Sequence, residues 1–119
     1  MISGAISWFQ KRKKIVAVEP ENCPTLNVAL KKGKPSNVSV SGVAASALGA
    51  KSIGNICFNL SRENQIESLV ISDDEIKKAQ RLLWENHRMF VEPAGAAALA
   101  AITSGKYNPK TCLLYTSPS

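Results

Sequence analysis

Few side chains in this 119-residue sequence have the type and spacing to do chemistry by themselves. The single histidine, His87, could act as a general base, although a histidine near a helix end more often interacts with the helix dipole. The three cysteines, Cys23, Cys57 and Cys112, are odd in number and show no Cys-x-x-Cys spacing. This argues against both a disulfide framework and a zinc site, and it fits a reducing, cytoplasmic setting.

A run of four basic residues, Lys11-Arg12-Lys13-Lys14, carries most of the formal net charge of +6. It could bind nucleic acid or an anionic surface, but no interleaved aromatic residues and no nucleic-acid-binding signature accompany it. A solvated helix end, whose cations suit the negative end of the dipole, is the simpler interpretation. No apolar run approaches the roughly 20 residues of a membrane span, and the apolar start precedes the basic residues, unlike a secretory signal. We therefore predict neither a nucleic-acid partner nor a membrane partner.

The composition, with 45% hydrophobic and 20% charged residues, is an ordinary globular balance that allows one core, and a piece of a larger domain would have the same composition. Apolar periodicity predicts helices that alternate with short strands, which is typical of an α/β fold. The expected helices cover residues 2–14, 24–32, 44–48, 52–60, 72–87 and 93–102, and the expected strands cover residues 15–18, 66–71 and, from its opening, 112–115. No repeat or linker marks a second domain.

Local signals define several of these boundaries. The apolar run 15–18 is typical of a strand buried in a parallel sheet, and Glu19-Pro20 should stop it. Gly33 should end the second helix, and Ser72 with Glu75 forms a capping box that begins a later one. The helix 93–102 consists of very small side chains, so its neighbours must approach it closely.

Four segments carry a resemblance, and they are Met1-Ile2-Ser3-Gly4, Glu19-Pro20, Val43 to Lys51 (VAASALGAK) and Val91 to Ala100 (VEPAGAAALA). In this order and at these separations they resemble the L-serine dehydratase/L-threonine deaminase family of fold-type II pyridoxal-phosphate enzymes, which are tryptophan synthase β-like. The resemblance implies a partial three-layer α/β fold in which helices flank a mostly parallel sheet. Residues 1–115 would be the C-terminal part of the large cofactor-binding domain, and residues 116–119 would be a non-native tail.

The resemblance implies that the intact enzyme removes ammonia from L-serine or L-threonine by α,β-elimination, which gives pyruvate or 2-oxobutanoate. The family's Schiff-base lysine lies in a Ser-x-Lys-x-Arg context, and a tetraglycine-like loop binds the cofactor phosphate. Neither motif occurs in this sequence. We therefore expect an inactive fragment that holds no catalytic residue. The alternatives are a truncated subunit that pairs with intact dehydratase, which is expected to be a homodimer, and a serine racemase-like relative.

The resemblance also implies a monovalent-cation site. Glu19 would supply its carboxylate, Thr25 its side-chain oxygen, and Cys23, Leu48 and Ala50 their backbone carbonyls. Related serine racemases have an aspartate at the position of Thr25, so the neutral hydroxyl favours K⁺ over a divalent ion such as Mg²⁺. The alternative is that Glu19 caps the following helix.

Three further positions are compared with the family. Ala47 matches a small residue that packs against the cofactor ring, and plain helix packing is the alternative. Glu92 lies in the family's Glu-Pro-Ala segment and is expected to organise the structure near the site. Thr116 falls where the family has a serine or cysteine that contacts the pyridine nitrogen, but no glycine-rich turn follows, so it is given no role.

Overall fold

The computed structural model describes residues 1–110, so the interpretations of Cys112, residues 112–115 and Thr116 concern residues outside the described part. Its two strands are β1 (Val16–Pro20) and β2 (Glu67–Ile71). Its helices are α1 (Ile2–Phe9), α2 (Thr25–Lys32), α3 (Ala45–Leu48), α4 (Asn55–Glu63), α5 (Asp73–His87) and α6 (Pro93–Thr103), with a 3₁₀ turn, η1 (Gln10–Arg12), after α1.

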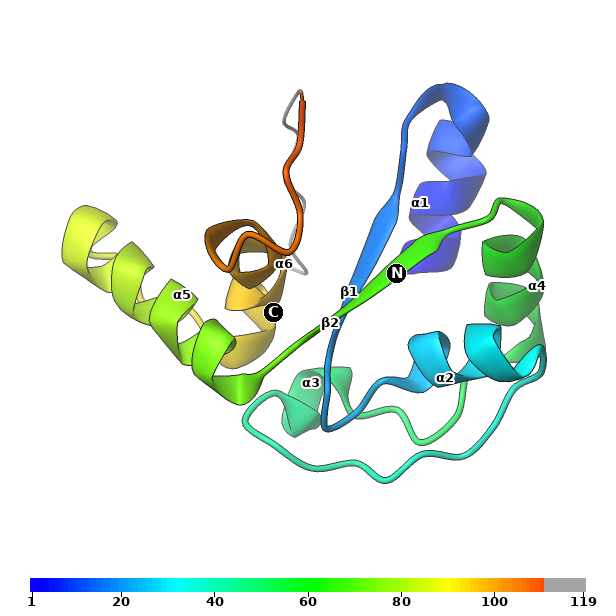
Figure 1. The fold of residues 1–119 in the computed structure, drawn as a ribbon, viewed down its shortest axis with the longest axis horizontal. Coiled ribbons are helices and arrows are strands. Elements are labelled where there is room, and N and C mark those ends of the chain that lie inside the picture. The colour runs from blue at the N-terminus through cyan, green and yellow to red at the C-terminus, as the bar shows by residue number, and fades with distance from the viewer. Residues whose placement is uncertain (111–119) are drawn as a thin grey trace.

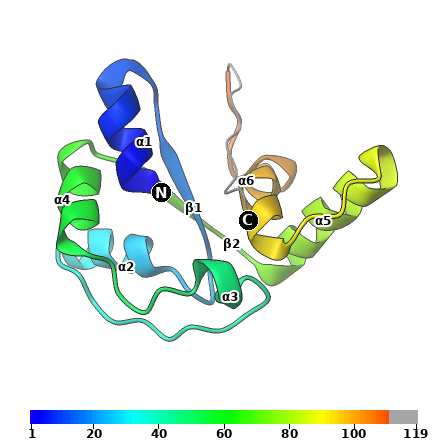
Figure 2. The ribbon, with the colours of Figure 1, turned by 180° about the vertical axis from the view of Figure 1, so that it is seen from behind.

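The two strands pair in parallel, in register from Val16 opposite Glu67 to Pro20 opposite Ile71. Helices α1, α2 and α4 lie on one side of the strands, and α5 and α6 lie on the other (Figures 1 and 2). The prediction of an α/β fold with a parallel sheet between helices is therefore confirmed. Among the described helices, none is both long and apolar enough to cross a membrane.

The first helix ends earlier than its sequence pattern predicts. The prediction of a helix over residues 2–14 is wrong beyond Phe9, because Gln10 has a φ of 50° and interrupts the helical backbone. The guanidinium of Arg12 turns back and donates hydrogen bonds to the carbonyls of Trp8, at 2.6 Å, and Phe9, at 3.3 Å. A cation from the basic run thus satisfies the last carbonyls of α1, as the helix-end interpretation predicts.

Two other boundaries differ from the sequence-based expectations. Glu19 and Pro20 do not stop β1 but are its last two residues, since proline is tolerated where a strand ends and no further amide donor is needed. The helix expected over residues 52–60 begins three residues later, at Asn55, after the extended Gly54. The predicted end of the second helix holds, because Gly33 adopts a left-handed φ of 71° directly after Lys32.

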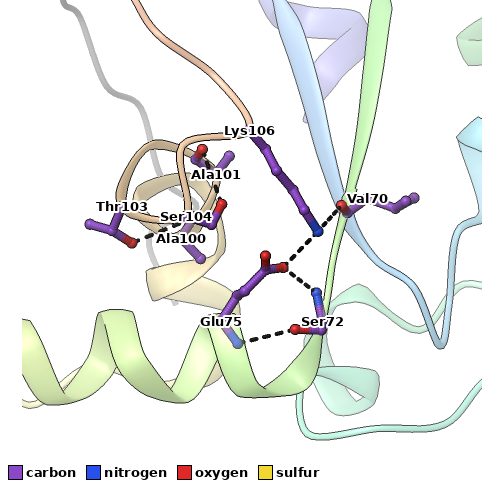
Figure 3. Close-up of polar contacts among 8 residues, drawn as sticks. All are labelled: Val70, Ser72, Glu75, Ala100, Ala101, Thr103, Ser104 and Lys106. Atoms are coloured by element: carbon purple, nitrogen blue, oxygen red, sulfur yellow. Dashed lines mark hydrogen bonds and ion pairs between the residues drawn. The ribbon is translucent and has the colours of Figure 1, made fainter.

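The start of α5 carries the predicted capping box (Figure 3). The Ser72 hydroxyl accepts a hydrogen bond from the Glu75 amide at 3.2 Å, and Glu75 Oε2 accepts one from the Ser72 amide at 2.7 Å. Lys106, which follows α6, donates to the same Glu75 oxygen at 2.8 Å and to the carbonyl of Val70 at 3.1 Å. The cap therefore also ties the end of β2 to the segment after α6.

These contacts determine the ionisation of Glu75. Burial acts to raise the pKa of this carboxyl, but the hydrogen bond from Lys106 and the bond from the Ser72 amide together lower it below its ordinary value. The carboxylate is therefore the form that the folded chain favours.

The core lies where α6 packs against α5 and the two strands. Its buried residues are Ala44, Ile71, Ile76, Ala79, Ala96, Ala97, Ala100 and Ala101. The four alanines from α6 present only methyl groups, so its backbone approaches the neighbouring elements closely, as the sequence predicts. Burying a side chain such as Ile76, which is fully inaccessible, contributes roughly 1.5–3 kcal/mol.

We predict that Ser72→Ala will lower the free energy of unfolding by about 1 kcal/mol, because it removes the acceptor for the Glu75 amide. Denaturant unfolding followed by far-ultraviolet circular dichroism measures this change. Ser39→Ala, at an exposed loop position, is the matched control and should change the free energy by less than about 0.5 kcal/mol. Equal effects of the two substitutions would contradict a stabilising role for the capping box.

Candidate functional site

Three loops meet at the carboxyl ends of the two parallel strands. The segment after β1 is joined to the end of β2 by the Glu21 amide, which donates to the Ile71 carbonyl at 2.8 Å. The turn before α3 joins both segments, because the Ser41 amide donates to the Asn22 carbonyl at 3.1 Å and the Val43 amide donates to Asp73 Oδ2 at 3.2 Å. In α/β sheets, ligands bind outside this end of the strands. The described residues therefore form a candidate ligand-binding edge here.

Glu19 is the charged group at the centre of this edge. Its Oε1 accepts a hydrogen bond from the Leu26 amide and its Oε2 one from the Asn27 amide, both at 2.8 Å. These amides belong to the first turn of α2, where the residue before the helix, Pro24, makes no side-chain cap. Glu19 thus does cap α2, which was the alternative to a cation ligand, although each oxygen keeps a second lone pair.

Burial is the larger influence on Glu19. It raises the pKa of this carboxyl above the ordinary value of 4.5, and the hydrogen bonds from the Leu26 and Asn27 amides only partly oppose the increase. A buried carboxylate whose charge is only partly compensated favours a positive group beside it. A cation at this edge would supply that charge.

The other expected cation ligands lie around the same helix start. The Thr25 hydroxyl donates to the Ala50 carbonyl at 2.5 Å, and the Thr25 amide donates to the Cys23 carbonyl at 3.0 Å. The structure therefore brings together the oxygens of Thr25 and Ala50, with that of Cys23 adjacent in the chain. Leu48 ends α3, two residues before Ala50, and no hydrogen bond among the described residues places its carbonyl in the cluster.

The chemistry of this donor set is that of backbone carbonyls, one hydroxyl and one carboxylate. Within residues 1–110, no group of three or more His, Cys, Asp or Glu side chains could hold a metal ion. The thiol of Cys23 is fully buried, and burial, together with the charges of Glu19 and Asp73, raises its pKa, so the neutral thiol is favoured. Hard, mostly neutral oxygens suit a cation of low charge rather than a transition metal.

Ala47 lies on the short helix α3, and its side chain is exposed. Figures 1 and 2 show α3 beside the ends of the strands, between the start of α5 and the start of α2. A methyl group that is exposed at this edge leaves room for a flat ring against it. Contact with the cofactor ring and helix packing both stay predictions for Ala47.

Two residues that shape this edge were missed by sequence reasoning. The Asp73 carboxylate accepts a hydrogen bond from the Val43 amide at 3.2 Å, which holds the turn before α3. Gly42 in that turn has a φ of 90°, and a Cβ atom there would lie 2.9 Å and 3.0 Å from the two Asp73 oxygens. The dipeptide Ser41-Gly42 is typical of a turn, so the sequence offered a signal for Gly42. It offered none for Asp73, because an acidic residue between Ser72 and Glu75 is expected in the first turn of a helix whatever else it contacts.

Glu92, which was expected to organise the structure near the site, is the residue before α6. Its side chain makes no capping hydrogen bond to that helix, and its Oε1 atom is buried with no hydrogen-bond partner among the described residues. The structure places Glu92 at a helix start, and its organising role stays a prediction.

The fold is that of an α/β protein with a parallel sheet, and its candidate ligand site lies at the carboxyl ends of the strands. The family described as "Pyridoxal-phosphate dependent enzyme" matches residues 1–117. The biosynthetic L-threonine dehydratase of Haemophilus influenzae is 33% identical over 79% of this chain and 18% of its own length. A serine dehydratase-like protein of Mus musculus is 37% identical over 76% of this chain and 28% of its own length.

A solved structure agrees with these matches. A threonine deaminase from T.th. superimposes with a TM-score of 0.78 and 26% identity, over 92% of this chain and 40% of that one. The chain therefore belongs to the pyridoxal-phosphate-dependent enzyme family. It spans less than a third of the length of the curated relatives named above.

The raised pKa of Glu19 predicts a definite pH dependence. The folded chain binds this proton more readily than the unfolded chain, so the stability that Glu19 contributes is full below 4.5 and is lost as the pH rises through the raised pKa. The free energy of unfolding of the unsubstituted chain should therefore fall relative to Glu19→Gln as the pH rises above 4.5. Urea unfolding at a series of pH values measures the difference.

Glu21→Gln, two residues away at an exposed position, is the matched control. A decline of equal size relative to Glu21→Gln would mean that Glu19 is not its source. If the unsubstituted chain instead gains stability relative to Glu19→Gln as the pH rises, the helix amides outweigh burial.

Proposed function

We propose that this chain is part of a pyridoxal-phosphate-dependent L-serine/L-threonine dehydratase, an ammonia-lyase that produces pyruvate or 2-oxobutanoate. The observation that carries the proposal is the identity with relatives named threonine dehydratase and serine dehydratase-like over three quarters of the chain or more. When bound, the cofactor supplies an electron sink for removal of the α-proton and loss of the β-hydroxyl. The substrate would be a small hydroxyamino acid.

The residues present fit a supporting role toward that cofactor. Helix α1 begins with no side-chain cap and no acidic residue in its first turn. Such a helix start leaves amides and the positive end of the dipole available to a phosphate. Ala47, exposed on α3, would lie against the cofactor ring. In this proposal the chain positions and stabilises the cofactor and does not itself move the α-proton.

We also propose that the chain by itself is inactive. Lys106 has Ser104 two residues before it, yet Asn108 stands where the family's lysine context has arginine. Its Nζ donates to Glu75 and to the Val70 carbonyl, so its ammonium is committed to the cap of α5. No other lysine of the sequence is closer to the required context.

We expect the 119-residue chain, saturated with pyridoxal phosphate, to release no 2-oxo acid from L-serine or L-threonine. The same chain expressed with its upstream coding sequence should release pyruvate, 2-oxobutanoate or both. A coupled assay for 2-oxo acids measures the product, and an assay for D-serine tests for a racemase. Product from the 119-residue chain would contradict its inactivity. The longer protein's failure to act on either amino acid would contradict the dehydratase assignment.

A truncated subunit that pairs with intact dehydratase is the second candidate, and exposed apolar side chains favour it. Trp84, Met89 and Phe90 line one surface pocket and are 50%, 51% and 92% exposed. A group of exposed large apolar side chains marks a surface to which a partner can bind. Co-purification of the chain with intact enzyme would support this role, and a chain that remains monomeric in its presence would contradict it.

We further propose that Glu19, Thr25 and the carbonyls of Cys23, Leu48 and Ala50 hold a monovalent cation, K⁺ in particular. The support is the hydrogen bond that joins the Thr25 hydroxyl to the Ala50 carbonyl, the position of the Glu19 carboxylate at the start of α2, and its only partly compensated charge. The ion would brace α3 against α2 and take no part in the reaction. A single carboxylate among neutral oxygens gives the set too little charge to favour a divalent ion.

We predict that K⁺ at 100 times its dissociation constant will stabilise the chain by about 2.7 kcal/mol relative to choline at equal ionic strength. Thr25→Val should abolish most of this gain, because it removes the hydroxyl ligand. Thr25→Asp should instead shift the preference toward Mg²⁺, because it adds a second carboxylate. Thermal unfolding in each salt is the measurement, with Thr103→Val, at an exposed position, as control. Equal stability in K⁺ and choline would remove the cation from the proposal.

A further inference from the structure

Helix α3 is too short to fix its own position. It contains four residues, Ala45–Leu48, and no side chain caps its start. Isolated helices shorter than about 12 residues are marginal in water, so α3 depends on tertiary contacts. Leu48 packs against the core, and hydrogen bonds hold the segments on either side of the helix. At its far end, the Thr25 hydroxyl donates to the Ala50 carbonyl. The contact that holds its near end comes from Asp73.

Asp73 is the first residue of α5, but that helix does not need its carboxylate. Ser72 and Glu75 already complete the capping box of α5. Asp73 Oδ2 instead accepts the hydrogen bond of the Val43 amide, two residues before α3. The carboxylate therefore serves the turn in front of α3, which is thirty residues away in the sequence.

The turn is shaped to receive this carboxylate. Gly42 has a φ of 90°, which side chains rarely adopt, and its missing Cβ leaves the space that both Asp73 oxygens occupy. On the other side, the Ser41 amide donates to the Asn22 carbonyl, and the Asn22 Cβ would lie 3.1 Å from a Cβ on Gly42. The turn thus fits between the segments that follow β1 and β2.

The second carboxylate oxygen of Asp73 indicates that this residue does more than fill space. Asp73 Oδ1 is buried and has no hydrogen-bond partner among the described residues. Leaving a buried polar atom without a partner costs roughly 1–3 kcal/mol. Ala44, which follows the anchored turn, is buried in the core, so the bond to Val43 fixes α3 relative to the core.

We propose that Asp73 is a positioning residue for the cofactor site. By holding the Gly42–Val43 turn, its carboxylate sets α3 and so the placement of Ala47 at the carboxyl ends of the strands. The part that concerns the cofactor depends on the proposed function, whereas the anchoring of α3 does not. The two parts can therefore fail separately.

Amide hydrogen exchange of the full chain, followed by NMR, tests the anchor. Asp73→Ala should speed exchange of two amides by about tenfold or more. These are the Val43 amide and the Leu48 amide, which donates to the carbonyl of Ala44 just before α3. Amides in the middle of α5 should exchange as they do in Asp74→Ala, the matched control that removes a neighbouring carboxylate from the same helix turn. Unchanged exchange at Val43 and Leu48, or an equal acceleration throughout α5 and α6, would overturn the proposal.

Asp73→Asn separates positioning from general stability. Its amide oxygen can still accept the Val43 hydrogen bond, so exchange at Val43 should stay within about threefold of the unsubstituted chain. This variant also carries the test if Asp73→Ala does not fold. Exchange in Asp73→Asn as fast as that expected for the alanine variant would overturn the anchor.

Pyridoxal phosphate added to the same samples tests the link to the cofactor. In the unsubstituted chain and in Asp73→Asn, the Ala47 amide resonance should shift on titration, and in Asp73→Ala the shift should be lost. A shift that persists in Asp73→Ala would overturn the positioning role. If Ala47 does not respond in the unsubstituted chain, the proposed cofactor site is contradicted, and hydrogen exchange alone decides whether Asp73 anchors α3.

Discussion

The parallel pairing of β1 with β2 is the constraint on which the rest of the structure depends. Because α2 follows β1 and α5 follows β2, parallel strands place the starts of both helices at the same edge of the sheet. Each start presents unpaired amides and the positive end of a dipole. A carboxylate accepts hydrogen bonds at each helix start, since Glu19 caps α2 and Glu75 completes the capping box of α5. The anionic groups at the candidate site therefore result from the topology.

The two carboxylates at this edge, Glu75 and Glu19, differ in how far their charges are compensated. Glu75 receives a lysine and an amide, and its pKa falls, whereas Glu19 receives two amides but is more deeply buried, and its pKa rises. The charge of Glu75 is thus compensated by contacts within the fold, whereas the charge of Glu19 is only partly compensated and could still bind a positive partner. A group with unused capacity at a ligand-binding edge is a better candidate for function than one already neutralised.

Much of the fold could be predicted because its signals are local. The Ser72–Glu75 box, the glycine after α2 and the small residues of α6 each act within a few residues. The early end of α1 could not be predicted, because the left-handed Gln10 breaks a pattern that apolar spacing alone would continue. At the site, the resemblance supplied Glu19, Thr25 and Ala50, whereas Asp73 depends on a contact across thirty residues that no local pattern encodes.

Helix α3 illustrates why such long-range contacts matter for function. The segment after α3 is joined to α2 through Thr25, and the turn before it is joined to α5 through Asp73. The position of this four-residue helix therefore depends on the ends of both strands. Gly42 and Gly49 flank it, and a side chain at Gly49 would collide with the Ala45 carbonyl and with Val40. A change in either strand, in either helix start or in either glycine is therefore expected to alter the position of Ala47. Conformational precision at this exposed methyl group thus depends on residues distributed over most of the described chain.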